Sequence, residues 1–328
     1  SERTINVIDG KENKAIVFPE AKIGDKYYNK FADAVLAAQQ ATNEDNKVVD
    51  VLKDKITVGT HSIEINGSVI INGNGADFYQ VDKEQDVSVF AYNNNKGVVS
   101  KEQNVNIIIN NAKNLRVWGN GSLIADNQKV KISLNDCSWD LSSKGFKNVD
   151  NIGMIMLRGA NGNGSYQLEM NNCNIENTSK TDAIHGNILS KVLINKCTFG
   201  NTARPINISH DLESDCTVTI TDCTFKNCGE EGMNPNTNYS APIRIVNKNE
   251  NGSLKANIGN VTIDGTKSRD QMGDVLLCDC RNGKEYYALT ANFSGCSELK
   301  VRNSSNNLIT IENNASQEVT VSNQSSNS

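Results

Sequence analysis

The sequence has few aromatic residues and very few prolines. Phe, Trp and Tyr together make up 5% of the chain, and only 4 of its 328 residues are Pro. A core built mainly from large aromatic side chains is therefore not expected. Glycine and asparagine, in contrast, recur every few residues, which is typical of many short strands separated by polar turns. The composition favours an all-β fold.

A basic stripe and a long apolar run are also missing from the sequence. Lys and Arg are scattered along a chain with a net charge of −5, so the electrostatic footprint of a nucleic-acid-binding protein is absent. No apolar run approaches the roughly 18 residues that a membrane-spanning helix needs. We therefore expect no nucleic-acid partner and no insertion into a membrane.

A short phrase that begins with Asn or Asp before a Cys returns along the chain. Its copies are NDCSWDLS at 135–142, NNCNIENT at 171–178, NKCTFGNT at 195–202, TDCTFKNC at 221–228, GNVTIDGT at 259–266 and a degraded SGCSELKV at 294–301. The repeat is roughly 25 residues long where it is shortest, which is within the range of stacked solenoid units. The Asn or Asp before the Cys is placed at a turn, because Asn tolerates left-handed backbone angles and its amide can bond the Asn one coil above.

Each repeat can be divided into three short strands with alternating apolar residues. A unit of this size cannot bury its apolar side alone, so neighbouring units must stack on it. Alternation then predicts columns of inward side chains along the solenoid. The columns are Ile206, Ile208, Ile243, Ile245, Val275 and Leu277; Cys137, Cys173, Cys197, Cys223, Val261 and Cys296; and Trp139, Ile175, Phe199, Phe225 and Ile263.

Nine cysteines raise the possibilities of a metal site and of disulfides. Five of them lie in the repeat column, which predicts buried free thiols rather than zinc ligands. The other four are Cys216, Cys228, Cys278 and Cys280, and a Cys216–Cys228 disulfide is conceivable in a secreted protein. We expect no metal site and no cofactor.

Three-strand coils, Asn at the turns and stacked Cys, Phe and Ile resemble the right-handed parallel β-helix of the pectin-lyase-like superfamily. The resemblance covers about residues 47–322 and implies an all-β, single-stranded, right-handed parallel β-helix with three strands per coil. It does not fix the function, because that superfamily includes lyases, hydrolases, phage tailspikes and adhesins.

Two further segments flank the predicted β-helix. Residues 1–46 are expected to form an N-terminal strand and an amphipathic capping helix, because Phe31, Ala34, Val35 and Ala38 make one apolar helical stripe. Residues 323–328 form a polar tail. The chain opens at Ser1 without a Met or a signal peptide, so we expect a mature segment whose parent protein has further domains.

One outward face is the expected location of the site. On the strand that contains PINISHD, at 205–211, the residues between the inward ones should face solvent. The candidate catalytic residues are His185 and Arg244, which strand spacing sets roughly 10 Å apart, the span of a sugar unit. The candidate substrate-binding residues are Arg158, Arg204, Asn207, His210, Asp211 and Tyr239, with Asp182 at the margin of the same strand.

Three functions are compatible with this face. The first is a secreted or cell-surface module of bacterial type, adhesin-like or carbohydrate-binding, whose partner is a polysaccharide or other glycan and which has no catalytic motif that we identify. The second is a polysaccharide lyase or glycoside hydrolase acting on acidic polysaccharide; the resemblance implies a base such as Arg244 or His185 beside bound calcium, or paired carboxylates such as Asp182 and Asp211. Calcium is expected only for a lyase. The third is a structural stalk.

Overall fold

The structure is a computed structural model. It describes residues 18–58, 63, 65, 67–80, 102–120, 124, 127–140, 142, 154–159, 164–230, 240–267, 273–277, 287–296, 298–303, 309–314 and 319–323.

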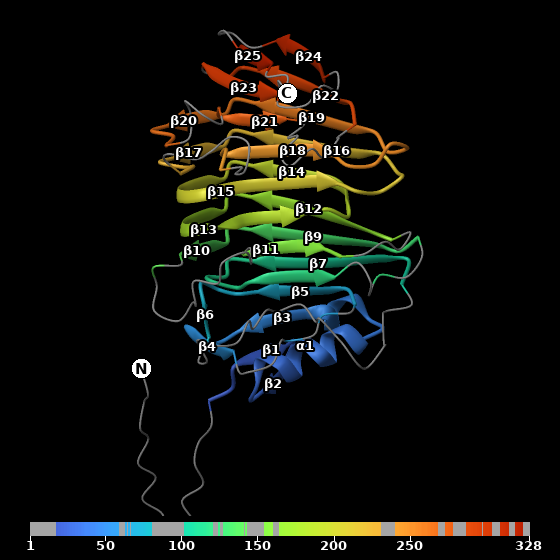
Figure 1. The fold of residues 1–328 in the computed structure, drawn as a ribbon. Helices are drawn as coiled ribbons and strands as arrows, with labels where there is room; N and C mark the ends of the chain where they lie inside the picture. The colour runs from blue at the N-terminus through green and yellow to red at the C-terminus, as the bar shows by residue number, and fades with distance from the viewer. Residues whose placement is uncertain are drawn as a thin grey trace, which may run out of the picture.

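Two long parallel sheets form the body of the described chain (Figure 1). The first sheet has 12 strands in the order β2 (Lys26–Tyr28), β1 (Ala21–Ile23), β3 (Val48–Val51), β5 (Val69–Asn72), β7 (Asn104–Asn110), β9 (Lys129–Asn135), β12 (Ser165–Asn171), β14 (Leu189–Asn195), β16 (Cys216–Thr221), β19 (Leu254–Gly259), β22 (Leu289–Ser294) and β24 (Ile309–Asn314). Among the described strands of this sheet, β1 pairs antiparallel with β2 and β3, and the other pairings are parallel.

The second sheet runs beside the first and takes the intervening strands. Its main order is β25 (Val319–Asn323), β23 (Leu299–Asn303), β21 (Val275–Leu277), β18 (Ile243–Asn247), β15 (Thr198–His210), β13 (Asn174–Gly186), β11 (Ile155–Arg158) and β8 (Val117–Asn120). Three short strands, β10 (Ser138–Asp140), β17 (Thr224–Lys226) and β20 (Thr262–Asp264), pair beside it, and β4 (Lys55–Val58) pairs with β6 (Asp77–Gln80). From β12 to β16 the chain alternates between the sheets, so it winds as a solenoid compatible with a β-helix.

The predicted helix is present at the N-terminal end of the solenoid. Helix α1 (Phe31–Gln40) buries Phe31, Ala34, Val35 and Ala38, and the 3-10 turn η1 (Glu44–Lys47) follows it. The Phe31 ring packs edge-on against Phe78 with centroids 5.1 Å apart. The backbone N–H of Phe31 donates to the Glu20 carboxylate at 2.9 Å, which holds the first turn. The apolar stripe therefore closes the interior below the first strands, as predicted.

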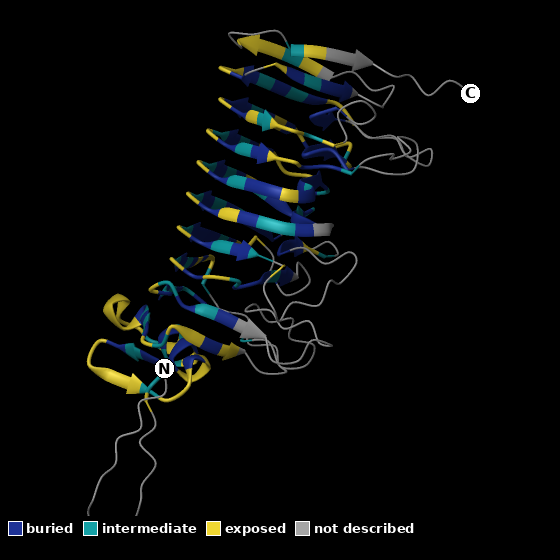
Figure 2. Ribbon diagram, turned by 90° about the vertical axis from the view of Figure 1, so that its left-hand side faces the viewer, coloured by how far each residue is buried: buried dark blue, intermediate teal, exposed yellow. Residues whose placement is uncertain are grey.

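The predicted inward columns are confirmed by the strand register. Trp139, Ile175, Phe199, Phe225 and Ile263 occupy aligned positions on neighbouring strands. The rings of Phe199 and Phe225 stack with centroids 4.9 Å apart and planes 7° from parallel. Figure 2 shows buried residues, in dark blue, in strand after strand along the solenoid. The interior is thus one continuous core in which each coil packs on the next.

The cysteine column is buried and its described members are free thiols. Each thiol lies near two backbone carbonyls, as in Cys223, whose Sγ is 3.1 Å from the Thr221 oxygen and 3.5 Å from the Ile194 oxygen. Cys216 and Cys228 are also free, so the conceivable disulfide between them is not formed. Burial raises the pKa of both thiols to about 12. Cys278 and Cys280 lie outside the described residues.

The residue before each column Cys has the left-handed backbone that the repeat predicts. The φ angles of Asp136, Asn172, Lys196, Asp222 and Asn260 are 54°, 53°, 53°, 54° and 50°. Side chains at these turns bond from coil to coil: the Asn172 amide donates to the Asp136 carboxylate at 2.6 Å, and the Asn260 amide donates to that of Asp222 at 3.1 Å. The turns therefore form a polar ladder along one edge of the solenoid.

Lys196 is the exception in this ladder, and replacing it by Asn should stabilise the protein. The left-handed conformation is energetically unfavourable for a lysine, and the lysine side chain has no amide that could bond the neighbouring turns. Asn tolerates this conformation and can form such a bond. We expect Lys196→Asn to raise the free energy of unfolding in urea by about 1 kcal/mol. The matched control is Lys226→Asn, an exposed position in β17, where no gain is expected. Equal effects at the two positions would contradict this account.

Candidate functional site

The predicted neighbours on the second sheet are adjacent in the structure. The register pairs His185 with Asn207, Asn207 with Arg244, and Arg244 with Leu276. These residues come from β13, β15, β18 and β21, so four successive strands of the sheet present them in one row. The sequence alignment of the repeats was therefore correct at this row.

The expectation that this row faces solvent is wrong for Asn207 and Arg244, whereas His185 is partly exposed. Asn207 and Arg244 are only 2% and 4% exposed, and every residue of β18 and β21 is buried. The row includes the apolar side chains of Met156 and Leu276, which are buried as well. This part of the sheet is covered on both faces, as parallel sheets commonly are. Alternation showed which way the side chains point, but it could not show whether that side is covered.

Asp182 is the centre of a buried polar network on this face. Its Oδ1 forms an ion pair with Arg204 Nε at 2.6 Å and its Oδ2 lies 2.8 Å from His185 Nδ1, and neither contact has the alignment of a hydrogen bond. The Asn207 amide donates to Oδ2 at 3.0 Å, and Arg244 Nη1 donates to Asn207 Oδ1 at 2.7 Å. The network therefore ties β13, β15 and β18 together. Sequence reasoning placed Asp182 only at its margin.

The network keeps the Asp182 carboxyl ionised. Burial by itself acts to raise the pKa of Asp182, which is 3% exposed. The contact with His185, the charge of Arg204 and the amide of Asn207 act in the opposite direction, and the net result is a pKa below the usual value. The ionised carboxylate of Asp182 and its partners therefore link three strands, which is a structural role.

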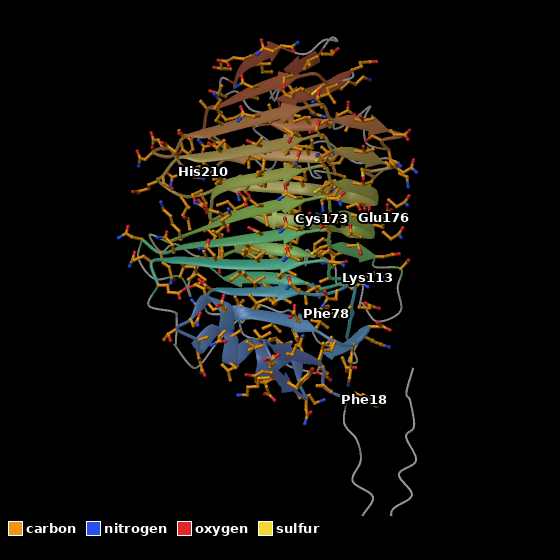
Figure 3. The ribbon with its side chains drawn as sticks, turned by 180° about the vertical axis from the view of Figure 1, so that it is seen from behind. Phe18, Phe78, Lys113, Cys173, Glu176 and His210 are labelled. Atoms are coloured by element: carbon orange, nitrogen blue, oxygen red, sulfur yellow. The ribbon has the colours of Figure 1, made fainter. Side chains whose placement is uncertain are left out.

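The other predicted site residues that the structure describes lie outside this network. Arg158 is exposed at the end of β11. His210 is fully buried at the end of β15, and Figure 3 shows it on the side of the solenoid opposite Glu176, at the start of β13. Asp211 follows in the loop that leads to β16. Tyr239 lies outside the described residues. The single predicted site is thus divided between two regions.

A polar groove of about 1100 Å³ lies on the first sheet, and Asp211 is part of it. Its floor consists of residues at the start of β9, β12, β14 and β16, and one wall is the loop 211–215. The lining is Asn127, Gln128, Lys129, Ser165, Gln167, Ser190, Lys191, Asp211, Leu212, Glu213, Ser214, Asp215, Thr217 and Asn249. We use "the groove" for this set of residues.

The groove was missed in the sequence because two separate features create it. Gln167, Lys191 and Thr217 form one outward row across β12, β14 and β16, and this row could have been found from the repeat. The wall depends on the loop 211–215 folding back beside the sheet. Loop conformation has no periodic signal in the sequence, so that part of the groove was not predictable.

Two negative findings apply to the described segments. They contain no group of three or more His, Cys, Asp or Glu side chains placed to hold a metal ion. Within the same segments, no helix combines the length and the hydropathy needed to cross a bilayer.

We found no match for this chain among protein-family models, curated proteins or solved structures.

Proposed function

We propose that this chain is a secreted or cell-surface module of bacterial type that binds a polysaccharide or other glycan in the groove. We further propose that its solenoid is right-handed with three strands per coil, like the β-helices of the pectin-lyase-like superfamily. The observation that carries the functional proposal is the groove itself: its size, its polar lining and its course across successive coils.

The size and chemistry of the groove suit a carbohydrate. A volume of about 1100 Å³ slightly exceeds the usual range for pockets that hold drug-sized ligands, so several sugar rings fit. Pockets for apolar ligands are lined mainly by apolar side chains, whereas this lining is rich in amides, hydroxyls and charges of both signs. Such groups can donate to and accept from the many hydroxyls of a glycan.

The course of the groove suits a polymer rather than a compact molecule. The row of Gln167, Lys191 and Thr217 crosses three strands that are about 4.8 Å apart, so the groove extends along the axis of the solenoid. A chain of repeating units lying along that axis meets a new strand of the floor at regular intervals. Binding is then distributed over several weak polar contacts.

Binding without cleavage is the activity that we propose. The carboxylates considered for hydrolysis are in different places, Asp182 in the buried network and Asp211 in the groove. Arg244, considered as the base of a lyase, is buried and donates to Asn207. The groove offers polar contacts but not the arrangement that either reaction was expected to use.

A double substitution in the floor of the groove tests the proposal. We expect Gln167→Ala with Lys191→Ala to weaken glycan binding about 10- to 100-fold, because each lost hydrogen bond contributes about 1 kcal/mol and one to a charged group somewhat more. Ligands are first selected on an array of neutral, uronate-containing and amino-sugar-containing oligosaccharides, and affinities are then measured by calorimetry.

The matched control lies in the same row of the first sheet but outside the groove. Lys255 and Thr290 continue the row beyond Thr217, and Lys255→Ala with Thr290→Ala should leave affinity unchanged. Equal losses in both double variants would contradict binding in the groove. An array without a bound glycan would refute the proposal and favour the structural stalk.

A further inference from the structure

A buried histidine, His210, contacts the loop 211–215, which forms one wall of the groove. His210 is 0% exposed, and its Nε2 lies 2.6 Å from the backbone oxygen of Ser214, which belongs to the loop 211–215. Because a carbonyl oxygen only accepts, Nε2 must carry the hydrogen in the neutral ring. The other nitrogen, Nδ1, is buried without a hydrogen bond to the described residues, and the ring also lies near the backbone of Leu189. The imidazole is thus one of the groups that hold the loop in place.

A second loop, 248–253, packs against the same histidine. Gly252 packs so closely that a Cβ at this position would come within 2.8 Å of His210 Nε2 and would also collide with the Leu212 carbonyl. The Asn249 side-chain amide donates to the backbone oxygen of Asp211 at 3.5 Å, and the Ser253 hydroxyl donates to Asp215 Oδ1 at 2.6 Å. The two loops therefore form one unit around the imidazole.

Burial and the groups around His210 shift its pKa in opposite directions, and burial has the larger effect. Burial lowers the pKa of His210, while the backbone oxygens of Ser214 and Leu189 and the carboxylates of Asp211 and Asp215 act to raise it. The net pKa lies below the ordinary value of 6.5. The other charged residues of these loops, Glu213, Lys248 and Glu250, are exposed. At neutral pH the ring is therefore uncharged, because the effect of burial on its pKa exceeds that of the groups around it.

We propose that His210 positions the wall of the groove and that its protonation releases the wall, so that a ligand bound at neutral pH is let go in acid. The part about the ligand rests on the proposed glycan-binding function, whereas the movement of the wall does not. A charged imidazole in this fully buried position lacks the solvation that it has when the loop is open.

The sign of the pH dependence follows from the lowered pKa. The open state takes up a proton near pH 6.5, the ordinary value for His, but the closed state does so only at lower pH. The closed wall therefore has its full stability above that value and loses it as the pH falls through the pKa of the closed state. Proton uptake and opening are linked in this range.

Amide hydrogen exchange on the full chain tests the movement without any ligand. We compare the backbone amides of residues 211–216 at about pH 7.5 and about pH 5, after correcting for the intrinsic exchange rates. We expect protection to fall about 10-fold or more in acid, a change of about 1.4 kcal/mol in the opening equilibrium. His210→Gln keeps an N–H donor toward Ser214 but does not titrate, so its protection should be equal at both pH values. His185→Gln should respond as the unchanged chain does.

Two results would overturn the proposal: an unchanged wall in acid, or a His210→Gln variant that still responds to pH. If His210→Gln fails to fold, the imidazole signal of His210 is followed by NMR in the unchanged chain. Its titration must then coincide with the loss of protection, and separate midpoints would overturn the proposal. Because no glycan is present, failure of glycan binding leaves this outcome unaffected.

Discussion

Replacing Phe225 by Ala is expected to lower the free energy of unfolding by about 3 to 5 kcal/mol. Phe225 is fully buried, its ring stacks on Phe199, and its register neighbour on the other side is Ile263. Truncation leaves a cavity between coils that are held in place by their own hydrogen-bond ladders, so the surrounding structure cannot collapse to fill it. Urea denaturation followed by far-ultraviolet circular dichroism measures the change.

The control for this substitution is its neighbour in the same strand. Thr224 points the other way in β17 and is partly exposed, so Thr224→Ala should change stability by less than about 0.5 kcal/mol. If the two substitutions cost the same, the interior column does not carry the stability that the stacked rings indicate.

Replacing Asp182 by Ala should be almost as damaging, at about 3 kcal/mol or more, for an electrostatic reason. The change removes the only carboxylate in contact with Arg204 and His185 in this network and deprives the Asn207 amide of its acceptor. The guanidinium of Arg204 then loses this ion pair within a largely buried part of the sheet. Because the pKa of Asp182 is lowered, its contribution is present above the usual pKa of an Asp, about 3.9, and is lost as the pH falls.

Two comparisons separate this charge effect from simple loss of packing. Asp211→Ala removes a carboxylate that is only partly buried, in the groove, and should cost less than about 0.5 kcal/mol at neutral pH. A double-mutant cycle of Asp182→Ala with Arg204→Ala should show a coupling energy of about 1 kcal/mol or more. A coupling near zero would mean that the 2.6 Å contact does not contribute to stability.

Features that recur with the repeat were predictable from the sequence. The inward positions of Phe199 and Phe225, the left-handed turn at Asn172 and the apolar stripe of α1 all follow from local spacing, because each depends only on which side of a strand or helix a residue occupies. The same alternation of inward and outward residues recurs in every coil. A pattern that is repeated six times is hard to misread.

Features that depend on one particular loop or one irregular strand were not predictable. Asp182 lies opposite Arg204 in the same register that pairs His185 with Asn207, so their adjacency follows from the alignment of the repeats. The repeat does not show that the Asp182 carboxylate is buried, because burial depends on what covers this part of the sheet. The covering of the Arg244 row and the folding of the loop 211–215 are likewise single events, and they decide which of the outward residues remain accessible.

The ladder of turn residues also affects how the length of such a protein can change during evolution. Asp136, Asn172, Lys196 and Asp222 occupy equivalent places, and each coil contacts mainly the coils next to it. A duplication or deletion that runs from one of these turns to the next adds or removes a complete coil and leaves every remaining ladder in register. The groove, which spans four strands of the first sheet, would be the part most altered by such an event. Lineages could therefore vary the height of the solenoid freely on either side of the groove while keeping the coils that build it.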